Sequence, residues 1–282
     1  MKALRTPEKL LIAYFMYTAV LALILPLRPE VRWVTWAVNA IVIGGYFLLA
    51  WTDSLRRGEF LSIVRDWYPM PQMLLAYREM GWFAQPHTDF HLERAWVAID
   101  KLILNDWGLK AAIESAGSIL PAVLEISYTL VYTIATFGMV MLYVYRRRER
   151  VPAFQAVCLL GILSAYALFP YFPSEPPRTV FPGEDFPAYM SAFRRFNWKM
   201  LGGYGIHTSV FPSAHVSGAF AGAFGMLLLL PEQKWVGRAL TVLAVLIATA
   251  TVYGRYHYAV DAIAGFSIAV IVTVAARNFI RL

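Results

Sequence analysis

The chain contains little cysteine and little charge for its length. One cysteine, Cys158, stands among 282 residues, which excludes a disulfide framework and a cysteine-rich metal site. Charged residues account for 15% of the chain, whereas a soluble domain carries about 25%. The sequence has no internal repeat and no basic stripe interleaved with aromatic residues, so the net charge of +7 does not indicate a nucleic-acid partner. In a hydrophobic chain this excess is typical of cytoplasmic loops and of contact with anionic headgroups.

Long apolar runs are abundant instead. Hydrophobic residues make up 59% of the chain, and a transmembrane helix needs roughly 17–25 predominantly apolar residues. Seven segments approach this length: 10–27, 34–52, 119–145, 153–172, 211–230, 236–254 and 258–276. We therefore predict an all-α integral membrane protein, a bundle of six to seven transmembrane helices. The first run follows Lys2, Arg5 and Lys9 but lacks a small-residue cleavage site, so we interpret it as an anchor.

Two intervals between the apolar segments are more polar. Residues 53–118 mix charged side chains with Trp and Tyr, a composition typical of helices that lie in the membrane interface. Residues 173–209 include the stretch PSEPPRTVFPGEDFP, which indicates a Pro-rich loop on one face of the membrane. We therefore expect interfacial helices in the first interval and an outer-face loop in the second.

The basic loops predict the orientation of the C-terminal half. The cluster 146–150 should lie in the cytoplasm, because short cytoplasmic loops are rich in Lys and Arg. Alternation then places 173–209 and 255–257 on the outer face and Arg281 inside. The N-terminal half leaves two alternatives open, because seven spans would put a basic N-terminus outside. Either one early segment does not cross, or 53–118 hides a crossing.

Three polar stretches meet on the predicted outer face. They are PSEPPR, ending at Arg178; FPSAHVSG, with Ser213 and His215; and GRYHYAVD, with Arg255, His257 and Asp261. Ionisable residues at membrane depth are costly and generally mark functional sites. A structural interpretation remains open for each, because a lone histidine is often a satisfied core residue and an arginine can extend to the headgroups.

Each of these residue types has a chemical reason to meet a phosphate. Arginine holds phosphate oxygens with a planar, permanently charged fork. Pro212 fits the first turn of a helix, and the free amides after it, with the hydroxyl of the next serine, would form an anion site. His257 and Asp261 are four residues apart and share one helix face, where the carboxylate orients the imidazole and makes its other nitrogen a better nucleophile or base. His215 is then available as a general acid.

These motifs resemble the type 2 phosphatidic acid phosphatase superfamily of integral membrane enzymes. That superfamily has a Pro-Ser-Gly-His motif and a final His-x-x-x-Asp, which are similar to 212–215 and 257–261 here. This chain departs from the usual pattern at four places: Ala214 replaces glycine, Tyr171 replaces a lysine, Thr179 replaces a proline, and Thr251 replaces an arginine.

The departures are similar to one branch of that superfamily. Pro-Pro-Arg and Arg-Tyr-His-Tyr-x-x-Asp resemble the inositol phosphorylceramide synthase-like branch, which includes membrane phosphotransferases. The stretches 65–67 (RDW) and 124–128 (LEISY) are also similar to it. The resemblance is strong over 160–275, moderate over 60–145 and weak before residue 55.

The resemblance implies a covalent mechanism. His257 would attack phosphorus and become a phosphohistidine, Asp261 would orient it, and His215 would protonate the leaving oxygen. The phosphoryl oxygens would be held by three further side chains, those of Arg178, Arg255 and Ser213. No metal and no other cofactor is implied, because arginines and amides supply the positive field. We further expect substrate contacts from the following residues: Glu125, which could instead bond a tyrosine such as Tyr128 or Tyr132, His207, which could be a loop residue, and Tyr256.

We therefore expect N-terminal anchor helices with an interfacial segment over 1–118, and a catalytic helical core over 119–282. The predicted function is a lipid phosphotransferase of the inner cell membrane, with its site on the non-cytoplasmic face and a lipid from the bilayer as substrate. A lipid phosphate phosphatase is the first alternative, since only the acceptor differs. A non-enzymatic lipid transporter or binding protein is the second, although the chain lacks the repeated halves common in transporters. The sequence does not predict the oligomeric state.

Overall fold

The computed structural model describes residues 4–56, 58–83, 89–206 and 208–279, and within these ranges every regular element is a helix. Short 3-10 turns and one π turn connect some of them. The α-helices are α1 (Thr6–Ile24), α2 (Pro29–Arg56), α3 (Glu59–Trp67), α4 (Pro69–Phe83), α5 (His91–Lys101), α6 (Leu109–Glu114), α7 (Ile119–Leu130), α8 (Ile134–Val144), α9 (Val151–Leu168), α10 (Pro177–Val180), α11 (Ala192–Tyr204), α12 (Ala214–Leu229), α13 (Lys234–Tyr253) and α14 (Ala259–Phe279).

The helix lengths confirm the predicted all-α membrane bundle. Among the described residues, six helical stretches are long and apolar enough to cross a membrane, and α12 is a shorter apolar helix. Every one of the seven predicted apolar segments falls on one of these helices. The segment predicted at 119–145 is not one regular helix, because a 3-10 turn, Val131–Thr133, separates α7 from α8.

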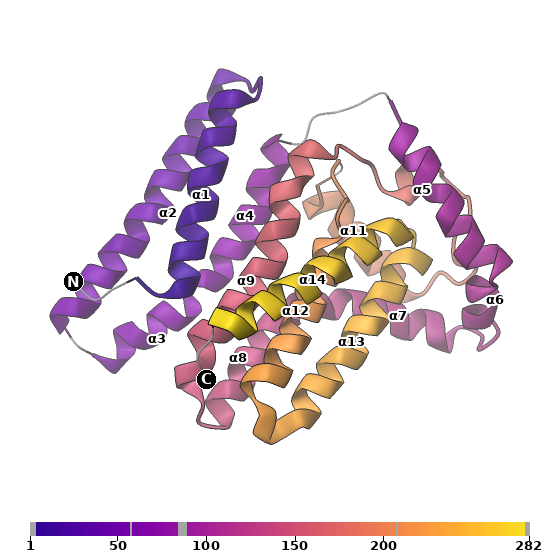
Figure 1. Cartoon of the computed structure of the whole chain (residues 1–282). Coiled ribbons are helices and arrows are strands. Elements are labelled where there is room, and N and C mark those ends of the chain that lie inside the picture. The colour runs from indigo at the N-terminus through magenta and orange to yellow at the C-terminus, as the bar shows by residue number, and fades with distance from the viewer. Residues whose placement is uncertain (1–3, 57, 84–88, 207, 280–282) are drawn as a thin grey trace.

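Helix α12 lies at the centre of the bundle and packs against α9, α13 and α14 (Figure 1). At Gly161 of α9, a Cβ would lie 2.7 Å from the Cβ of Ala221. At Gly265 of α14, a Cβ would collide with the carbonyl oxygen of Ser213. These two glycines let α9 and α14 approach α12 more closely than larger residues would allow. The start of α12 is thereby held against the first turns of α14.

The N-terminal helices form a second layer against α9, on the side of the molecule opposite α5 and α6 (Figure 1). Phe15 of α1 and Met80 of α4 are buried in the same apolar cluster as Leu163 of α9. Asn39 of α2 donates from Nδ2 to the carbonyl oxygen of Phe15 and to Oγ1 of Thr18, both at 2.8 Å. Apolar packing and buried hydrogen bonds therefore join these helices to the rest of the bundle.

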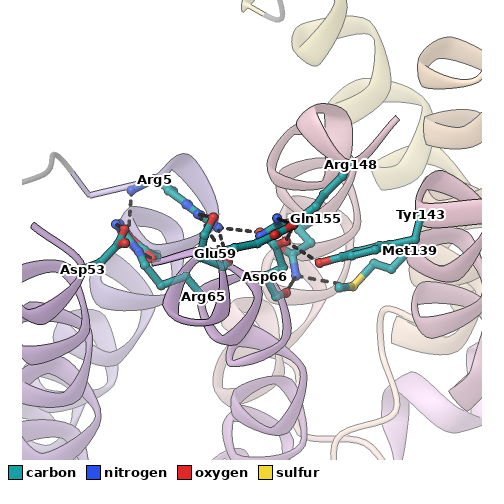
Figure 2. Close-up of polar contacts among 11 residues, drawn as sticks. Arg5, Asp53, Glu59, Arg65, Asp66, Met139, Tyr143, Arg148 and Gln155 are labelled. Atoms are coloured by element: carbon teal, nitrogen blue, oxygen red, sulfur yellow. Dashed lines mark hydrogen bonds and ion pairs between the residues drawn. The ribbon is translucent and has the colours of Figure 1, made fainter. Parts of the chain in front are cut away.

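A buried ionic network closes the end of the bundle at which α3 lies (Figure 2). Arg65 binds Glu8 at 2.6 Å and Asp53 at 2.8 Å, so that one guanidinium joins α3 to α1 and α2. All three side chains are almost completely buried. Removing one partner of such a buried group costs about 3–5 kcal/mol, because the remaining charge loses its compensation.

The neighbouring residue, Asp66, extends this network to the other side of the bundle. Its carboxylate binds Arg5 at 2.5 Å and Arg148 at 2.7 Å, and it also accepts a hydrogen bond from the Tyr143 hydroxyl (Figure 2). The stretch 65–67, which resembles a branch motif, therefore joins the N-terminal helices to α8 and the loop before α9. It lies at the end of the bundle opposite the turn between α13 and α14.

Helix α4 connects the two ends of the bundle. It begins one residue after α3, and near its other end Tyr77 accepts a hydrogen bond from the amide of Ile206 at 2.8 Å, while Arg78 donates to the carbonyl oxygen of Tyr204 at 2.7 Å. Helix α4 packs against α1 and α9, but it is not among the helical stretches of the described residues that are long and apolar enough to cross a membrane. The choice between the two alternatives for the N-terminal half therefore stays a prediction.

Candidate active site

A cavity of about 420 Å³ opens between α4, α8, α9 and α12. Most of its wall is apolar, but one end carries an arginine, two histidines and several tyrosines. The residues that concern the chemistry are Arg178, His215, His257, Tyr77, Tyr128, Tyr132, Tyr166 and Tyr256; the apolar wall includes Met73, Leu74, Ala135 and Ile162. A cavity with a polar end and an apolar extension suits an amphiphilic ligand.

His257 lies in the turn between α13 and α14, and its protonation is set by what Nδ1 contacts. Nδ1 is 3.0 Å from the carbonyl oxygen of Val210 and 3.3 Å from Oδ2 of Asp261. A carbonyl oxygen can only accept, so Nδ1 carries the hydrogen and Nε2 keeps its lone pair. Burial lowers the pKa of His257 to about 3, and the positive charge of Arg178 adds to this shift. The imidazole is therefore neutral near pH 7, as a nitrogen nucleophile must be.

Asp261 contacts both the imidazole of His257 and the backbone of the turn between α13 and α14. Its Oδ2 accepts a hydrogen bond from the amide of Tyr258 at 2.9 Å, and its backbone carbonyl accepts one from the amide of Ser213. The carboxylate is completely buried in the first turn of α14. Asp261 therefore contacts the His257 ring, but the expectation that the two share one helix face is wrong, because α14 begins at Ala259 and His257 precedes it.

His215 lies in the first turn of α12 and faces His257 across the cavity. Its Nδ1 is 3.4 Å from Nε2 of His257, and the two rings are edge-on. Tyr128 of α7 stacks on the imidazole of His215 with ring centroids 5.1 Å apart. The structure thus brings His215, His257 and Asp261 together from two helices that are distant in sequence.

Arg178 supplies the positive charge at the polar end of the cavity. Its amide donates to the carbonyl oxygen of Arg255, and its Nη1 lies 3.4 Å from the carbonyl oxygen of Tyr256. Its guanidinium also lies 5.7 Å from the centroid of the Tyr256 ring. Burial lowers the pKa of Arg178 from its usual value. Among the described residues no carboxylate forms an ion pair with Arg178, so its charge is available to an anion in the cavity.

Arg255 lies elsewhere, in contrast to the expectation that it holds a phosphate. Its guanidinium is completely buried and binds Asp100 of α5 at 2.5 Å. Asp100 also accepts the amide of Ala259, the first residue of α14, at 2.7 Å. Arg255 has a positive φ of 62°, which turns its side chain away from the direction followed by its neighbours. The pair therefore supports the turn that carries His257, and Arg255 is not part of the cavity wall.

Ser213 also has a role other than the expected one. It is the N-cap of α12, and its Oγ accepts a hydrogen bond from the amide of Val216 at 3.3 Å. Its own amide is used by Asp261, so it is not free for an anion. The side chain is completely buried and does not line the cavity, whereas the two following residues, Ala214 and His215, do.

The expected substrate contacts fall into three cases. Glu125 is buried behind the cavity wall, where it binds Arg194 at 2.7 Å, Asn197 at 2.8 Å and the hydroxyl of Tyr256 at 2.6 Å. The tyrosine that bonds Glu125 is therefore neither Tyr128 nor Tyr132. Tyr256 contributes its ring to the cavity but not its hydroxyl, which Glu125 occupies. His207 lies outside the described residues.

Two further features were not foreseen from the sequence. Asp100, the partner of Arg255, stands in a charged amphipathic stretch in which nothing local distinguishes it. Besides the expected Tyr256, the tyrosines of the cavity come from α4, α7, the 3-10 turn and α9, so that only the folded chain collects them. Within the described ranges, no group of three His, Cys, Asp or Glu side chains could hold a metal ion. The prediction of a metal-free reaction stays a prediction.

Fold and site together define an all-helical integral membrane protein with a two-histidine pocket at one end of its bundle. The family model of the PAP2 superfamily matches residues 95–275, which is more than half of the chain. The protein therefore belongs to the PAP2 superfamily, whose members are typically phosphatases or phosphotransferases. No curated protein and no solved structure matches the chain. The match establishes membership of the superfamily, but it does not establish that the chain belongs to the inositol phosphorylceramide synthase-like branch.

Proposed function

We propose that the protein is a membrane phosphotransferase that takes a phosphoryl or phospho-head group from a lipid phosphate and passes it through a phosphohistidine at His257. The observation that supports this best is the pairing of a neutral imidazole, with Nε2 unprotonated, and Arg178, a cation without a carboxylate partner in the described chain. Both line a cavity whose remaining wall is mostly apolar. A phosphate would meet the cation and the nucleophile while its hydrocarbon chain lies along α4, α8 and α9.

The reaction has two balanced steps. In the first, Nε2 of His257 attacks phosphorus, the bond from phosphorus to the leaving oxygen breaks, and that oxygen takes a proton from His215. Arg178 stabilises the charge on the phosphoryl oxygens. In the second, His215 removes the proton from an acceptor hydroxyl, whose oxygen displaces His257. A lipid or polyol hydroxyl makes the enzyme a phosphotransferase, and water makes it a phosphatase.

The test is product analysis on the purified protein in detergent. Lipid phosphates and phosphodiesters are supplied with and without a lipid acceptor, and products are followed by mass spectrometry. A head group moved onto the acceptor supports transfer, whereas free phosphate alone identifies a phosphatase. The His257→Ala variant should form neither product, and alkaline digestion of the wild type should yield a phosphohistidine peptide containing residue 257.

The matched control is His91→Ala, because His91 is exposed and pairs with Asp89 outside the cavity. It should turn over like the wild type. Turnover by His257→Ala at the wild-type rate would remove the proposed nucleophile. Bound lipid without either product in the wild type would favour a binding or transport protein.

We further propose that the cavity opens to the non-cytoplasmic face of the inner membrane, because the basic cluster 146–150 lies at the opposite end of the bundle. Cys158 is a free cysteine that lines the cavity, so cysteines are introduced into a Cys158→Ala background. An impermeant maleimide applied to intact cells should label Glu184→Cys, an exposed position in the loop that follows Arg178, and should not label Glu149→Cys. The reverse pattern would contradict the proposed orientation.

A further inference from the structure

The apolar segment 119–144 is interrupted where it passes the cavity. Helix α7 ends at Leu130, a 3-10 turn occupies Val131–Thr133, and α8 begins at Ile134. A short 3-10 stretch within a longer helix often marks a functional position. The central residue of this turn, Tyr132, lines the cavity, and its side chain is 57% exposed although it lies inside a membrane segment.

Tyr132 contacts the side of His215 that faces away from His257. Its hydroxyl lies 3.4 Å from Nε2 of His215, and the two rings are edge-on at 81° with centroids 5.8 Å apart. Tyr128 stacks on the face of the same imidazole. The ring of His215 is therefore held between two tyrosines, and only Tyr132 reaches one of its nitrogens. A separation of 3.4 Å is long for a hydrogen bond, as is common for catalytic groups before the substrate binds.

The hydrogen-bond contacts determine which nitrogen carries the hydrogen, first in the ring of His257 and then in that of His215. Nδ1 of His257 carries a hydrogen because it faces the carbonyl oxygen of Val210, so Nε2 of His257 is an acceptor. Its neighbour at 3.4 Å, Nδ1 of His215, must then be the donor. Nε2 of His215 is therefore unprotonated in the resting protein, and it requires a donor. The hydroxyl of Tyr132 is the group positioned to be that donor.

We propose that Tyr132 is a positioning residue that keeps His215 in the orientation of a general acid. The inference rests on the proposed function of His215 and His257. When His215 is neutral with its hydrogen on Nδ1, Tyr132 donates to Nε2. When His215 is an imidazolium, Nε2–H donates to the same hydroxyl oxygen. Because a phenol both donates and accepts, Nδ1–H stays directed at the leaving oxygen in either protonation state, and the ring does not need to turn.

The proton balance of the reaction is unchanged by this role. The neutral His215 of the resting protein first takes up a proton from solvent at Nε2 and becomes an imidazolium. Its Nδ1–H bond then breaks as the hydrogen moves to the leaving oxygen, and Nε2–H remains hydrogen-bonded to Tyr132. The acceptor hydroxyl later returns a proton to Nδ1. Tyr132 itself gains and loses no proton, so it acts through His215 and not on the substrate.

Other tyrosines of the cavity do not share this position. The hydroxyl of Tyr77 accepts the amide of Ile206, and that of Tyr256 donates to Glu125. The ring of Tyr166 packs against those of Tyr77 and Phe169. A control must therefore lie outside the cavity, and Tyr145→Phe serves, because it removes a tyrosine hydroxyl that contacts Trp235 and does not line the cavity.

The test compares Tyr132→Phe with Tyr145→Phe and the wild type on two substrates. One has an alkyl leaving oxygen that must be protonated, and the other is a 4-nitrophenyl phosphate ester whose phenolate leaves without protonation. Tyr132→Phe should lower kcat on the alkyl substrate by roughly 10–100-fold, a fraction of the ~100–10,000-fold typical of general acids. Its KM should stay within about twofold, and its kcat on the activated ester should match the wild type. The alkaline limb of its kcat profile should move to lower pH, because the imidazolium loses the acceptor at Nε2.

The result that overturns the inference is an equal loss on both substrates, which marks a structural role, or no loss on either. Tyr132→Leu serves as a second variant without the hydroxyl and must show the same dependence on the leaving group. Tyr145→Phe must leave both activities unchanged. His257→Ala separates the two proposals: if it remains active, the proposed function fails, whereas an inactive His257→Ala with a fully active Tyr132→Phe refutes only the role of Tyr132.

Discussion

The buried ion pair between Asp100 and Arg255 allows a test of whether Arg255 stabilises the fold or binds the substrate phosphate. Both side chains are completely buried, with Asp100 bound to Nη1 of Arg255 at 2.5 Å. Nε and Nη2 of Arg255 have no hydrogen-bond partner in the described part of the chain, so Asp100 is its main compensation. The pair also reaches the first amide of α14 through Ala259. Arg255 should therefore act on the stability of the turn and not directly on a phosphate.

The expected magnitude follows from burial. Asp100→Asn keeps an oxygen for the amide of Ala259 but leaves the guanidinium of Arg255 uncompensated, which costs about 3–5 kcal/mol. Arg255→Met leaves the carboxylate alone and should cost a similar amount. The double variant removes both charges, and replacing a buried ion pair by neutral groups of similar volume is often neutral. We therefore expect a coupling energy of about 3 kcal/mol or more between the two sites.

The assay is unfolding of the purified protein in mixed micelles, by titration with a denaturing detergent, together with turnover of the folded fraction. Both single variants should unfold at lower detergent concentration, and the double variant should recover most of the loss. Turnover per folded molecule in the double variant should stay within about tenfold of the wild type. If Arg255→Met unfolds like the wild type, and the folded double variant is inactive, then Arg255 acts on the substrate and the reasoning is refuted.

Three further outcomes are expected. First, burial lowers the pKa of His257 to about 3, so kcat/KM should persist below pH 6.5 and fall only as His257 takes up a proton; an acid limb centred at 6.5 would contradict this. Second, Gly265→Val should lower the free energy of unfolding by about 1–3 kcal/mol or more and reduce turnover, because a Cβ at this position meets the carbonyl oxygen of Ser213. Gly44→Ala, where a Cβ meets open space, should be neutral, and thermal unfolding distinguishes the two variants. Third, Arg65→Met should cost about 3–5 kcal/mol in the same unfolding assay but leave KM unchanged, since Arg65 is remote from the cavity; a changed KM would show coupling between the ends.

The two ends of the bundle have different roles, one structural and one in the proposed chemistry. One end is closed by the ion pairs of Arg65 and Asp66, which join the N-terminal helices to α8 and α9. The other end holds the histidines in a turn supported by Asp100 and Arg255. Helix α4 links them, since it begins beside the ionic network and contributes Tyr77 to the cavity.

The membrane helices were predictable because a bilayer imposes a minimum length of apolar sequence on any helix that crosses it. Helix α4 falls in the interval 53–118, for which helices that do not span were expected, and its 15 residues extend about 22 Å, less than the hydrocarbon core requires. Its course is decided by packing between α1 and α9. The break at Tyr132 was missed, since 119–145 is continuously apolar and hydropathy does not report a 3-10 turn.

The amino-acid sequence by itself determined the chemistry of the site. It identified His257, Asp261 and His215 as one group, and these side chains contact each other in the structure, with His257 in the turn before α14. Only the tertiary structure decided which charges are available. Arg178 and Arg255 look equivalent in the sequence, but a buried carboxylate from α5 neutralises one of them and leaves the other facing the cavity. The reason is physical: a buried charge must find a partner, and that partner can come from any part of the folded chain.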